Sequence, residues 1–179
     1  MSDTPLVESA VLVPFVRDPA GEWRLVVIRR TPGGMHSGQL AFPGGRIDPA
    51  DESALHAALR EAEEEIGLPR HRVRVLCELP RIETRTTGFA ITPYLGLAER
   101  PAAWTPAEAE VAEILEPKLA QLRAPEARRH ANNLLPRGWE AVRLPYFDVH
   151  GHRLWGASER ILHPLLARIA AGEWPELLG

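Results

Sequence analysis

Cysteine and lysine are almost absent from this sequence: Cys77 and Lys118 are the only examples in 179 residues. A lone cysteine excludes a disulfide bond within the chain, and its position in an apolar run predicts a buried, inert thiol rather than a nucleophile. The other 20 of the 21 basic residues are therefore arginines. Arginine can grip a phosphate group through two hydrogen bonds, which lysine cannot do, although a genome rich in G and C would produce the same bias.

The sequence also lacks a surplus of positive charge and any long apolar run. Its formal net charge is −3, which argues against wholesale binding of nucleic acid, because such binding neutralises phosphates with basic residues. No apolar segment reaches the length that crosses a membrane, and residues 1–6 lack the basic start and apolar core of a signal peptide. We therefore expect a cytoplasmic protein with no nucleic-acid or membrane partner.

The length and the apolar pattern predict one domain, residues 1–179, that mixes strands with helices. Strands are predicted at Val7–Val16, Trp23–Arg30, Arg72–Leu79, Phe89–Leu97, Ala141–Phe147 and His152–Trp155. Helices are predicted at Ser53–Ile66, Pro117–Arg123 and Ser158–Ala171, and Ala107–Leu115 is either a strand or a helix. Pro164 lies inside the last helix and predicts a kink or a later start. These elements indicate an α/β sandwich with a mixed sheet.

The helix predicted at Ser53–Ile66 has two distinct faces. At about 100° per residue, one apolar stripe is formed by Leu55, Leu59, Ala62 and Ile66. A different face collects three glutamates at i, i+3 and i+4 spacing: Glu61, Glu64 and Glu65. Like charges at this spacing repel one another, but a hard divalent cation such as Mg²⁺ or Mn²⁺ prefers carboxylate oxygens. The alternative is a solvated acidic face with Arg60 as its counter-charge.

A glycine-rich loop precedes this helix. The segment Phe42–Gly45 ends in two glycines, and because glycine has no Cβ the backbone there can approach a ligand closely. A glycine carbonyl would supply a further oxygen ligand, although an ordinary turn has the same composition. Asp51 or Ser53 is expected to cap the start of the helix, and Gly67 to end it. A loop of this kind running into an acidic helix resembles a site for a metal-bridged diphosphate.

The loop and the helix together resemble the Nudix box. The family pattern is glycine, five residues, glutamate, seven residues, and then Arg-Glu-aliphatic-x-Glu-Glu-x-Gly-aliphatic. Arg60–Leu68 matches the second half of this pattern, and seven residues separate Glu52 from Arg60, as the pattern requires. Gly45 is separated from Glu52 by six residues rather than five.

A longer stretch, from about Val11 to Leu166, is similar to the coenzyme A pyrophosphatases within this superfamily, in which the extra residue in the box is usual. Their upstream motif runs Arg-Ser, three residues, Arg, three residues, Gly, three residues, Phe-Pro-Gly-Gly. Arg29, Gly38 and Phe42–Gly45 match this motif, whereas Arg30 replaces its serine and Gly34 replaces its second arginine. Further matches are Asp48, Asp51, Ala58–Ala62, Gly88–Phe89, Thr92–Pro93, Glu110–Val111 and Trp155–Ala157.

The resemblance implies an α/β/α sandwich that hydrolyses a nucleoside diphosphate linked to another group, with Mg²⁺ or Mn²⁺ as cofactor. Carried over by position, the metal ligands would be Glu61, Glu65, Glu64, the carbonyl of Gly44 or Gly45, and Glu110. Catalytic roles fall to Glu64, Arg60 and Glu61, and the base that takes a proton from water stays open between Glu64, Glu61 and Glu110. The substrate-binding candidates are Arg29, Arg30, Arg46 and Phe42, with Arg81 and Arg85 as further phosphate ligands. His36 is expected to be a loop residue and Trp155 a core residue.

The substrate implied by the longer resemblance is coenzyme A, with 4′-phosphopantetheine and adenosine 3′,5′-bisphosphate as products. One alternative is a Nudix hydrolase for ADP-ribose, NADH or a nucleoside triphosphate. Another is a nucleotide-sensing domain that has lost catalysis, but such domains typically lose glutamates of the box, whereas all three helix glutamates and Arg60 are present here. The expected partner is a small nucleotide, and the expected state is a monomer or a homodimer.

Overall fold

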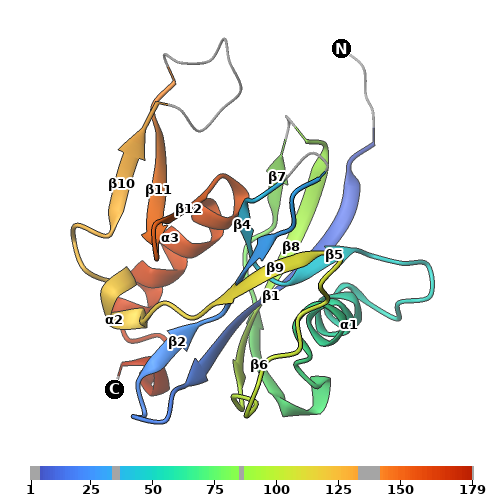
Figure 1. Ribbon diagram of the computed structural model, residues 1–179, viewed down its shortest axis with the longest axis horizontal. Coiled ribbons are helices and arrows are strands. Elements are labelled where there is room, and N and C mark those ends of the chain that lie inside the picture. The colour runs from blue at the N-terminus through green and yellow to red at the C-terminus, as the bar shows by residue number, and fades with distance from the viewer. Residues whose placement is uncertain (1–4, 34–36, 85–86, 133–141, 179) are drawn as a thin grey trace.

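A mixed six-stranded sheet forms the centre of the computed structural model, which describes residues 5–33, 37–84, 87–132 and 142–178 (Figure 1). Its strand order is β2 (Trp23–Leu25), β1 (Val7–Arg17), β8 (Phe89–Ala98) and β6 (Val73–Glu78). Two short strands extend it, β5 (Gly44–Arg46) beside β1 and β7 (Ile82–Thr84) beside β8. β1 and β8 run parallel, and the other pairs of this sheet are antiparallel.

Two antiparallel three-stranded sheets and the helices complete the described part of the fold. One sheet contains β4 (Leu40–Ala41), β3 (Val27–Arg30) and β9 (Val111–Leu115), and the other contains β10 (Arg128–Ala131), β11 (Leu144–Val149) and β12 (His152–Trp155). The α-helices are α1 (Ala54–Ile66), α2 (Leu119–Leu122) and α3 (Ala157–Ala170), and the 3₁₀ turns are η1 (Arg70–Arg72) and η2 (Pro175–Leu177). Among the described residues, no helix has both the length and the apolarity to cross a membrane.

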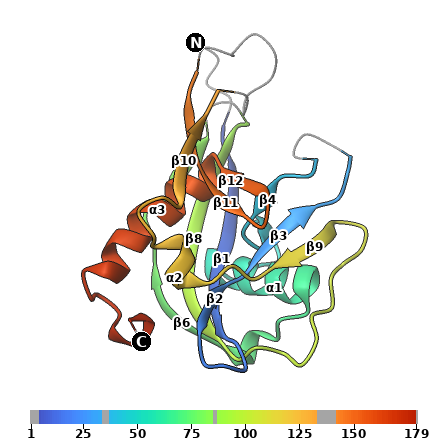
Figure 2. The same cartoon turned by 60° about the vertical axis from the view of Figure 1, so that its left-hand side comes forward.

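The two long helices cover opposite faces of the central sheet. Successive side chains of a strand point to opposite faces, and in β1 they enter two different hydrophobic clusters. Val13 packs in the cluster that contains Leu162 of α3, whereas Leu12 packs in the cluster that contains Ala58 of α1. Figures 1 and 2 both show α1 and α3 on either side of β1 and β8. The predicted α/β/α sandwich with a mixed sheet is therefore confirmed.

Most of the predicted elements are present, but one strand prediction is wrong. The segment Trp23–Arg30 is not one strand: β2 pairs with β1 in the central sheet, and β3 pairs with β4 and β9 in another. The ambiguous Ala107–Leu115 contains a strand, β9, and the C-terminal helix begins at Ala157, so it does not start late despite Pro164. The short strands β4, β5, β7 and β10 were not predicted, because two to four residues carry too little pattern.

Helix α1 begins and ends as predicted, but its buried face differs from the predicted stripe. Ser53 is the N-cap, since its hydroxyl accepts a hydrogen bond from the backbone N–H of His56 at 3.1 Å, and Gly67 ends the helix in the left-handed conformation. The fully buried residues of the helix are Ala57, Ala58, Ala62, Glu65 and Ile66, while Leu55 and Leu59 are only half-buried. One glutamate, Glu65, therefore lies within the buried face rather than beside it.

Candidate active site

The glycine loop lies directly against two glutamates of α1. β5 pairs with β1, which holds Gly44 so close to that strand that a Cβ on it would lie 2.4 Å from the carbonyl oxygen of Ala10. The backbone N–H of Gly44 donates a hydrogen bond of 2.8 Å to the Glu65 carboxylate. A Cβ on Gly45 would lie 2.6 Å from the carboxylate of Glu61. At Gly44 only glycine allows this approach, because the nearest atoms belong to the backbone, whereas a side chain at position 45 would displace the Glu61 carboxylate.

Glu65 is a buried carboxyl group whose protonation is perturbed. The residue is 2% exposed, and burial raises the pKa of its carboxyl group to about 7, with the charges of Glu61 and Glu110 acting in the same direction. The Gly44 N–H and the positive charge of Arg30 oppose this shift of the pKa. Three carboxyl groups and one guanidinium, contributed by α1, β3 and the segment before β9, therefore act on one another electrostatically.

The other two glutamates of the cluster lie progressively further out. The Glu61 side chain is 17% exposed, and burial raises its pKa against the influence of Arg60, while Glu64 and Glu110 raise it further. The Glu64 side chain is 59% exposed and accepts a hydrogen bond from Arg60 at 3.1 Å. The three glutamates of the box thus extend from the core to the solvent across one side of α1.

Arg60 is held by Asp51, a pairing that the sequence analysis missed. Two guanidinium nitrogens of Arg60 donate to the two oxygens of Asp51 at 2.9 and 2.8 Å, and the Asp51 side chain is only 2% exposed. The hydrogen bonds from Arg60 hold the pKa of Asp51 well below its usual range, and Asp51 in turn raises the pKa of Arg60. Glu52, the residue at the glutamate position of the box when the spacing is counted from Arg60, is exposed. Asp51 follows Gly45 after a spacer of five residues, as the first half of the box pattern requires, so this signal was available in the sequence.

Two neighbouring arginines of β3 have different surroundings. Arg29 donates from Nε to Glu113 of β9 at 3.0 Å, so its guanidinium already has a carboxylate partner. The Arg30 side chain makes no hydrogen bond or ion pair with any residue in the described part of the chain, and it is close enough to Glu65 to lower the pKa of that carboxyl group. Arg30 is thus the arginine with the greater freedom to bind an anion beside the glutamates.

The remaining substrate-binding candidates differ in how accessible their side chains are. Arg46 lies over the ring of Phe89 with 5.8 Å between the guanidinium carbon and the ring centroid, next to the glycine loop. Phe42 is 2% exposed and packs in the hydrophobic core, so its side chain supports the loop and is not on a surface that a substrate reaches. Arg81 is paired with Glu8, and Trp155 is half-buried. Gly34, His36 and Arg85 lie outside the described residues.

The donor atoms around Glu65 fit a hard divalent cation. Burial and mutual repulsion make the carboxyl groups of Glu61 and Glu65 difficult to ionise, and a bound cation would stabilise their charged forms. The glycines of the adjacent loop have no side chains that would block access to these groups. As the side chains are placed, no three His, Cys, Asp or Glu side chains among the described residues converge on one metal position. In this arrangement Glu61 and Glu64 accept hydrogen bonds from Arg60, and Glu65 accepts one from the Gly44 N–H.

The burial of Glu65 predicts how stability depends on pH when no metal is bound. The folded chain has a Glu65 pKa of about 7 against the ordinary value of 4.5, so between these pH values it binds more protons than the unfolded chain. The free energy of unfolding is therefore expected to fall as pH rises through this window, by up to about 3 kcal/mol from this residue. Denaturant unfolding in EDTA between about pH 5 and pH 8 measures it.

The control for this prediction is Glu65→Gln, which removes the titration. The difference in unfolding free energy between the variant and the wild type should grow with pH in favour of the variant. A difference that stays constant from about pH 5 to pH 8 would show that Glu65 ionises normally in the folded protein.

Comparisons with known proteins agree with this fold and site. Residues 7–137 match the family model described as the NUDIX domain. The chain is 36% identical over 167 residues to an uncharacterized Nudix hydrolase, NudL, of Salmonella paratyphi B, an alignment that covers 90% of this chain and 82% of the relative. The chain therefore belongs to the Nudix family, and it is a Nudix hydrolase. Hydrolases of this family generally need divalent metal ions, in keeping with the donor atoms around Glu65.

Solved structures share the fold at low sequence identity. A MutT/nudix family protein from Enterococcus faecalis superposes with a TM-score of 0.61 at 18% identity, covering 99% of this chain and 68% of that one. The NUDIX domain of Shewanella oneidensis NrtR, complexed with ADP ribose, superposes with a TM-score of 0.52 at 20% identity, covering 66% of this chain and 77% of that one. At these identities the likeness concerns the fold alone.

Proposed function

We propose that this hydrolase cleaves the diphosphate bond of coenzyme A or of its derivatives, with 4′-phosphopantetheine and adenosine 3′,5′-bisphosphate as products. The observation that carries the proposal is Arg30, a guanidinium without a side-chain partner among the described residues that acts electrostatically on Glu65. A guanidinium in this position suits a phosphate group held next to a metal site. The similarity to coenzyme A pyrophosphatases from about Val11 to Leu166 selects coenzyme A among the diphosphates.

In this proposal different residues bind the metal, orient its ligands and accept a proton during hydrolysis. Glu61, Glu65 and the carbonyl of Gly45 would hold Mg²⁺ or Mn²⁺, and Glu64 and Glu110 are candidates for further ligands. When bound, the cation would neutralise the diphosphate and would lower the pKa of a water molecule. Arg60 orients the carboxylates of Glu61 and Glu64, to which it donates hydrogen bonds of 2.9 and 3.1 Å. One of Glu64, Glu61 or Glu110 accepts the proton of the attacking water.

A second candidate substrate is ADP-ribose, or NADH, which has the same central diphosphate. The observation in its favour is the structural likeness to a NUDIX domain that was solved with ADP ribose. Gly34 also stands where the coenzyme A motif has an arginine. With either substrate, we propose that the protein acts on a small nucleotide in the cytoplasm, as a monomer or a homodimer.

The specificity proposal predicts that removal of the 3′-phosphate from coenzyme A weakens catalysis. One charged bidentate contact contributes roughly 1.5–3 kcal/mol, so dephospho-coenzyme A should be cleaved with at least about tenfold lower kcat/KM. Mass spectrometry of the products from coenzyme A, dephospho-coenzyme A, NADH and ADP-ribose, each with Mg²⁺ or Mn²⁺, tests this. More efficient hydrolysis of NADH or ADP-ribose than of coenzyme A would remove the specificity claim and leave the family assignment intact.

Arg30 provides the matched variant for this comparison. Arg30→Gln should reduce the preference for coenzyme A over dephospho-coenzyme A if this guanidinium binds the 3′-phosphate. Arg74→Gln is the control, because Arg74 is an exposed residue of β6 whose guanidinium pairs with Glu176 at 3.1 Å. A preference that Arg30→Gln leaves unchanged would assign the 3′-phosphate to another residue.

A further inference from the structure

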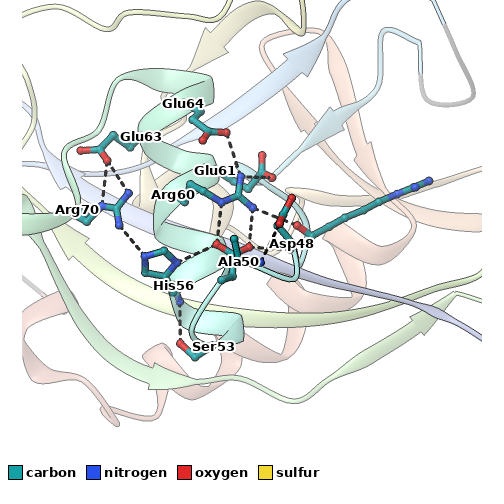
Figure 3. A network of polar contacts seen from close by, with 11 residues as sticks. Asp48, Ala50, Ser53, His56, Arg60, Glu61, Glu63, Glu64 and Arg70 are labelled. Atoms are coloured by element: carbon teal, nitrogen blue, oxygen red, sulfur yellow. Dashed lines mark hydrogen bonds and ion pairs between the residues drawn. The ribbon is translucent and has the colours of Figure 1, made fainter.

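Asp51, the partner of Arg60, also contacts His56, and polar contacts continue from His56 to Arg70 and Glu63. Figure 3 shows His56, Arg60, Glu63 and Arg70 along α1. His56, one turn before Arg60 on the helix, places Nδ1 2.9 Å from Oδ1 of Asp51. Arg70 of η1 donates from a terminal guanidinium nitrogen to Nε2 of the same ring at 3.0 Å. Arg70 is also paired with Glu63 of α1 at 3.0 Å. The contacts thus run from Glu63 through Arg70, His56 and Asp51.

The geometry defines which nitrogen of His56 carries the proton. A guanidinium has only donors, so the Nε2 atom that faces Arg70 must be the acceptor. The ring is then neutral, and its single proton lies on Nδ1, from which it is donated to Asp51. With the opposite tautomer, Nε2–H would face the guanidinium and a lone pair would face the carboxylate, and both contacts would be repulsive.

Asp51 is consequently enclosed by donors. One oxygen accepts from His56 and from Nε of Arg60, and the other accepts from Arg60 at 2.8 Å and from the backbone N–H of Asp48 at 2.8 Å. These hydrogen bonds together restrain the orientation of the Asp51 carboxylate. Since Arg60 donates to both oxygens of Asp51, the orientation of Asp51 sets where Arg60 directs its remaining N–H groups.

Those remaining N–H groups of Arg60 reach the candidate metal ligands. One terminal nitrogen donates both to Glu61 at 2.9 Å and to Glu64 at 3.1 Å. A rotation of the guanidinium would therefore displace both carboxylates together. Partners of this kind, one layer behind metal ligands, typically change metal affinity by about 10- to 100-fold when they are lost.

We propose that His56 and Arg70 are positioning residues of this site, which orient Asp51 and, through Arg60, the carboxylates of Glu61 and Glu64. The inference rests on the proposed function in that it takes these glutamates to hold the metal. A structural role alone does not account for the arrangement, because the Arg70 and Glu63 side chains are 42% and 41% exposed, and exposed ion pairs contribute little to stability. Their effect is on orientation rather than on folding.

The test uses His56→Leu, which removes both hydrogen bonds of the ring, and His56→Gln, whose amide can donate to Asp51 and accept from Arg70. Mn²⁺ affinity of the purified full chain, measured by electron paramagnetic resonance of the free ion without substrate, should fall about tenfold in the first variant. The glutamine variant should recover most of that loss. Arg70→Gln should weaken Mn²⁺ binding in the same direction, by a smaller factor.

Two further measurements separate positioning from simple destabilisation. In an Asp51→Asn background, His56→Leu should cause no additional loss of Mn²⁺ affinity, because His56 acts through Asp51. Nitrogen-15 NMR of the wild type should show the His56 proton on Nδ1. The control is Arg100→Gln, which breaks a bidentate pair with Glu116, 2.8 Å on each arm, away from these contacts and should leave Mn²⁺ affinity unchanged.

The outcomes distinguish this inference from the proposed function. If His56→Leu binds Mn²⁺ as tightly as the wild type, or if the proton is on Nε2, the inference is wrong whatever the enzyme hydrolyses. A wild type that binds no Mn²⁺ at all also overturns it. If Mn²⁺ affinity falls as expected but neither coenzyme A nor its dephospho form is cleaved, the positioning role stands and the proposed substrate fails.

Discussion

Glu65→Gln is expected to lower turnover of a nucleoside diphosphate substrate by about a thousandfold, equivalent to about 4 kcal/mol in the activation barrier. The substitution keeps the shape of the side chain but removes the negative charge that we propose to bind the metal. The fold should survive, because Glu65 is 2% exposed and the raised pKa of its carboxyl group shows that a neutral side chain is favoured there. Steady-state kinetics with Mg²⁺ and with Mn²⁺, together with thermal unfolding, measure both effects.

The control for this prediction is the same substitution at an exposed glutamate. Glu52→Gln changes a residue that the box pattern selects but that the structure places at the surface, where no side-chain partner is described. Its turnover should remain close to that of the wild type. If Glu65→Gln retained more than about a third of wild-type turnover, Glu65 would not be a metal ligand, since the loss of a ligand raises the barrier by several kcal/mol.

Gly44→Ala is expected to be the most destabilising of these changes, reducing the free energy of unfolding by about 4 kcal/mol and the melting temperature by about 10 °C. Two costs combine. Gly44 has a φ of 153°, which side chains rarely adopt, and the new Cβ would lie 2.4 Å from the Ala10 carbonyl oxygen. β5 would have to separate from β1, and the N–H that Gly44 donates to Glu65 would move with it.

Gly33→Ala separates these two costs. Gly33 also has a positive φ, 127°, but a Cβ there would have no neighbour within 4 Å among the described residues. This control should lose only the conformational cost, about 1 kcal/mol. Equal losses in the two variants, measured by denaturant unfolding, would mean that the contact between β5 and β1 yields easily and does not constrain the glycine loop.

Local patterns predicted the long elements because each carries enough residues to show its period. The helix at Ser53–Ile66 has both its cap and its terminating glycine in the sequence, and the structure uses both. The prediction of a single strand at Trp23–Arg30 was wrong because every residue from Leu25 to Ile28 is buried. An unbroken buried run does not reveal that the chain passes from one sheet to another. The pairing of Val7–Val16 with Phe89–Ala98 joins segments far apart in the chain, and no local pattern indicates which strands become neighbours.

The sequence by itself determined the family chemistry: three glutamates at helical spacing after a glycine loop define one acidic helix face wherever that helix is placed. Only the tertiary structure decided that these glutamates differ. The packing of α1 against the sheet buries Glu65 and leaves the Glu64 side chain 59% exposed, and burial is what separates the pKa of one carboxyl group from that of another. The structure likewise chose Asp51 over Glu52 as the partner of Arg60. Residue spacing left both open, since the spacing from Gly45 selects Asp51 and the spacing from Arg60 selects Glu52, and the choice depends on which carboxylate the folded loop turns toward the guanidinium.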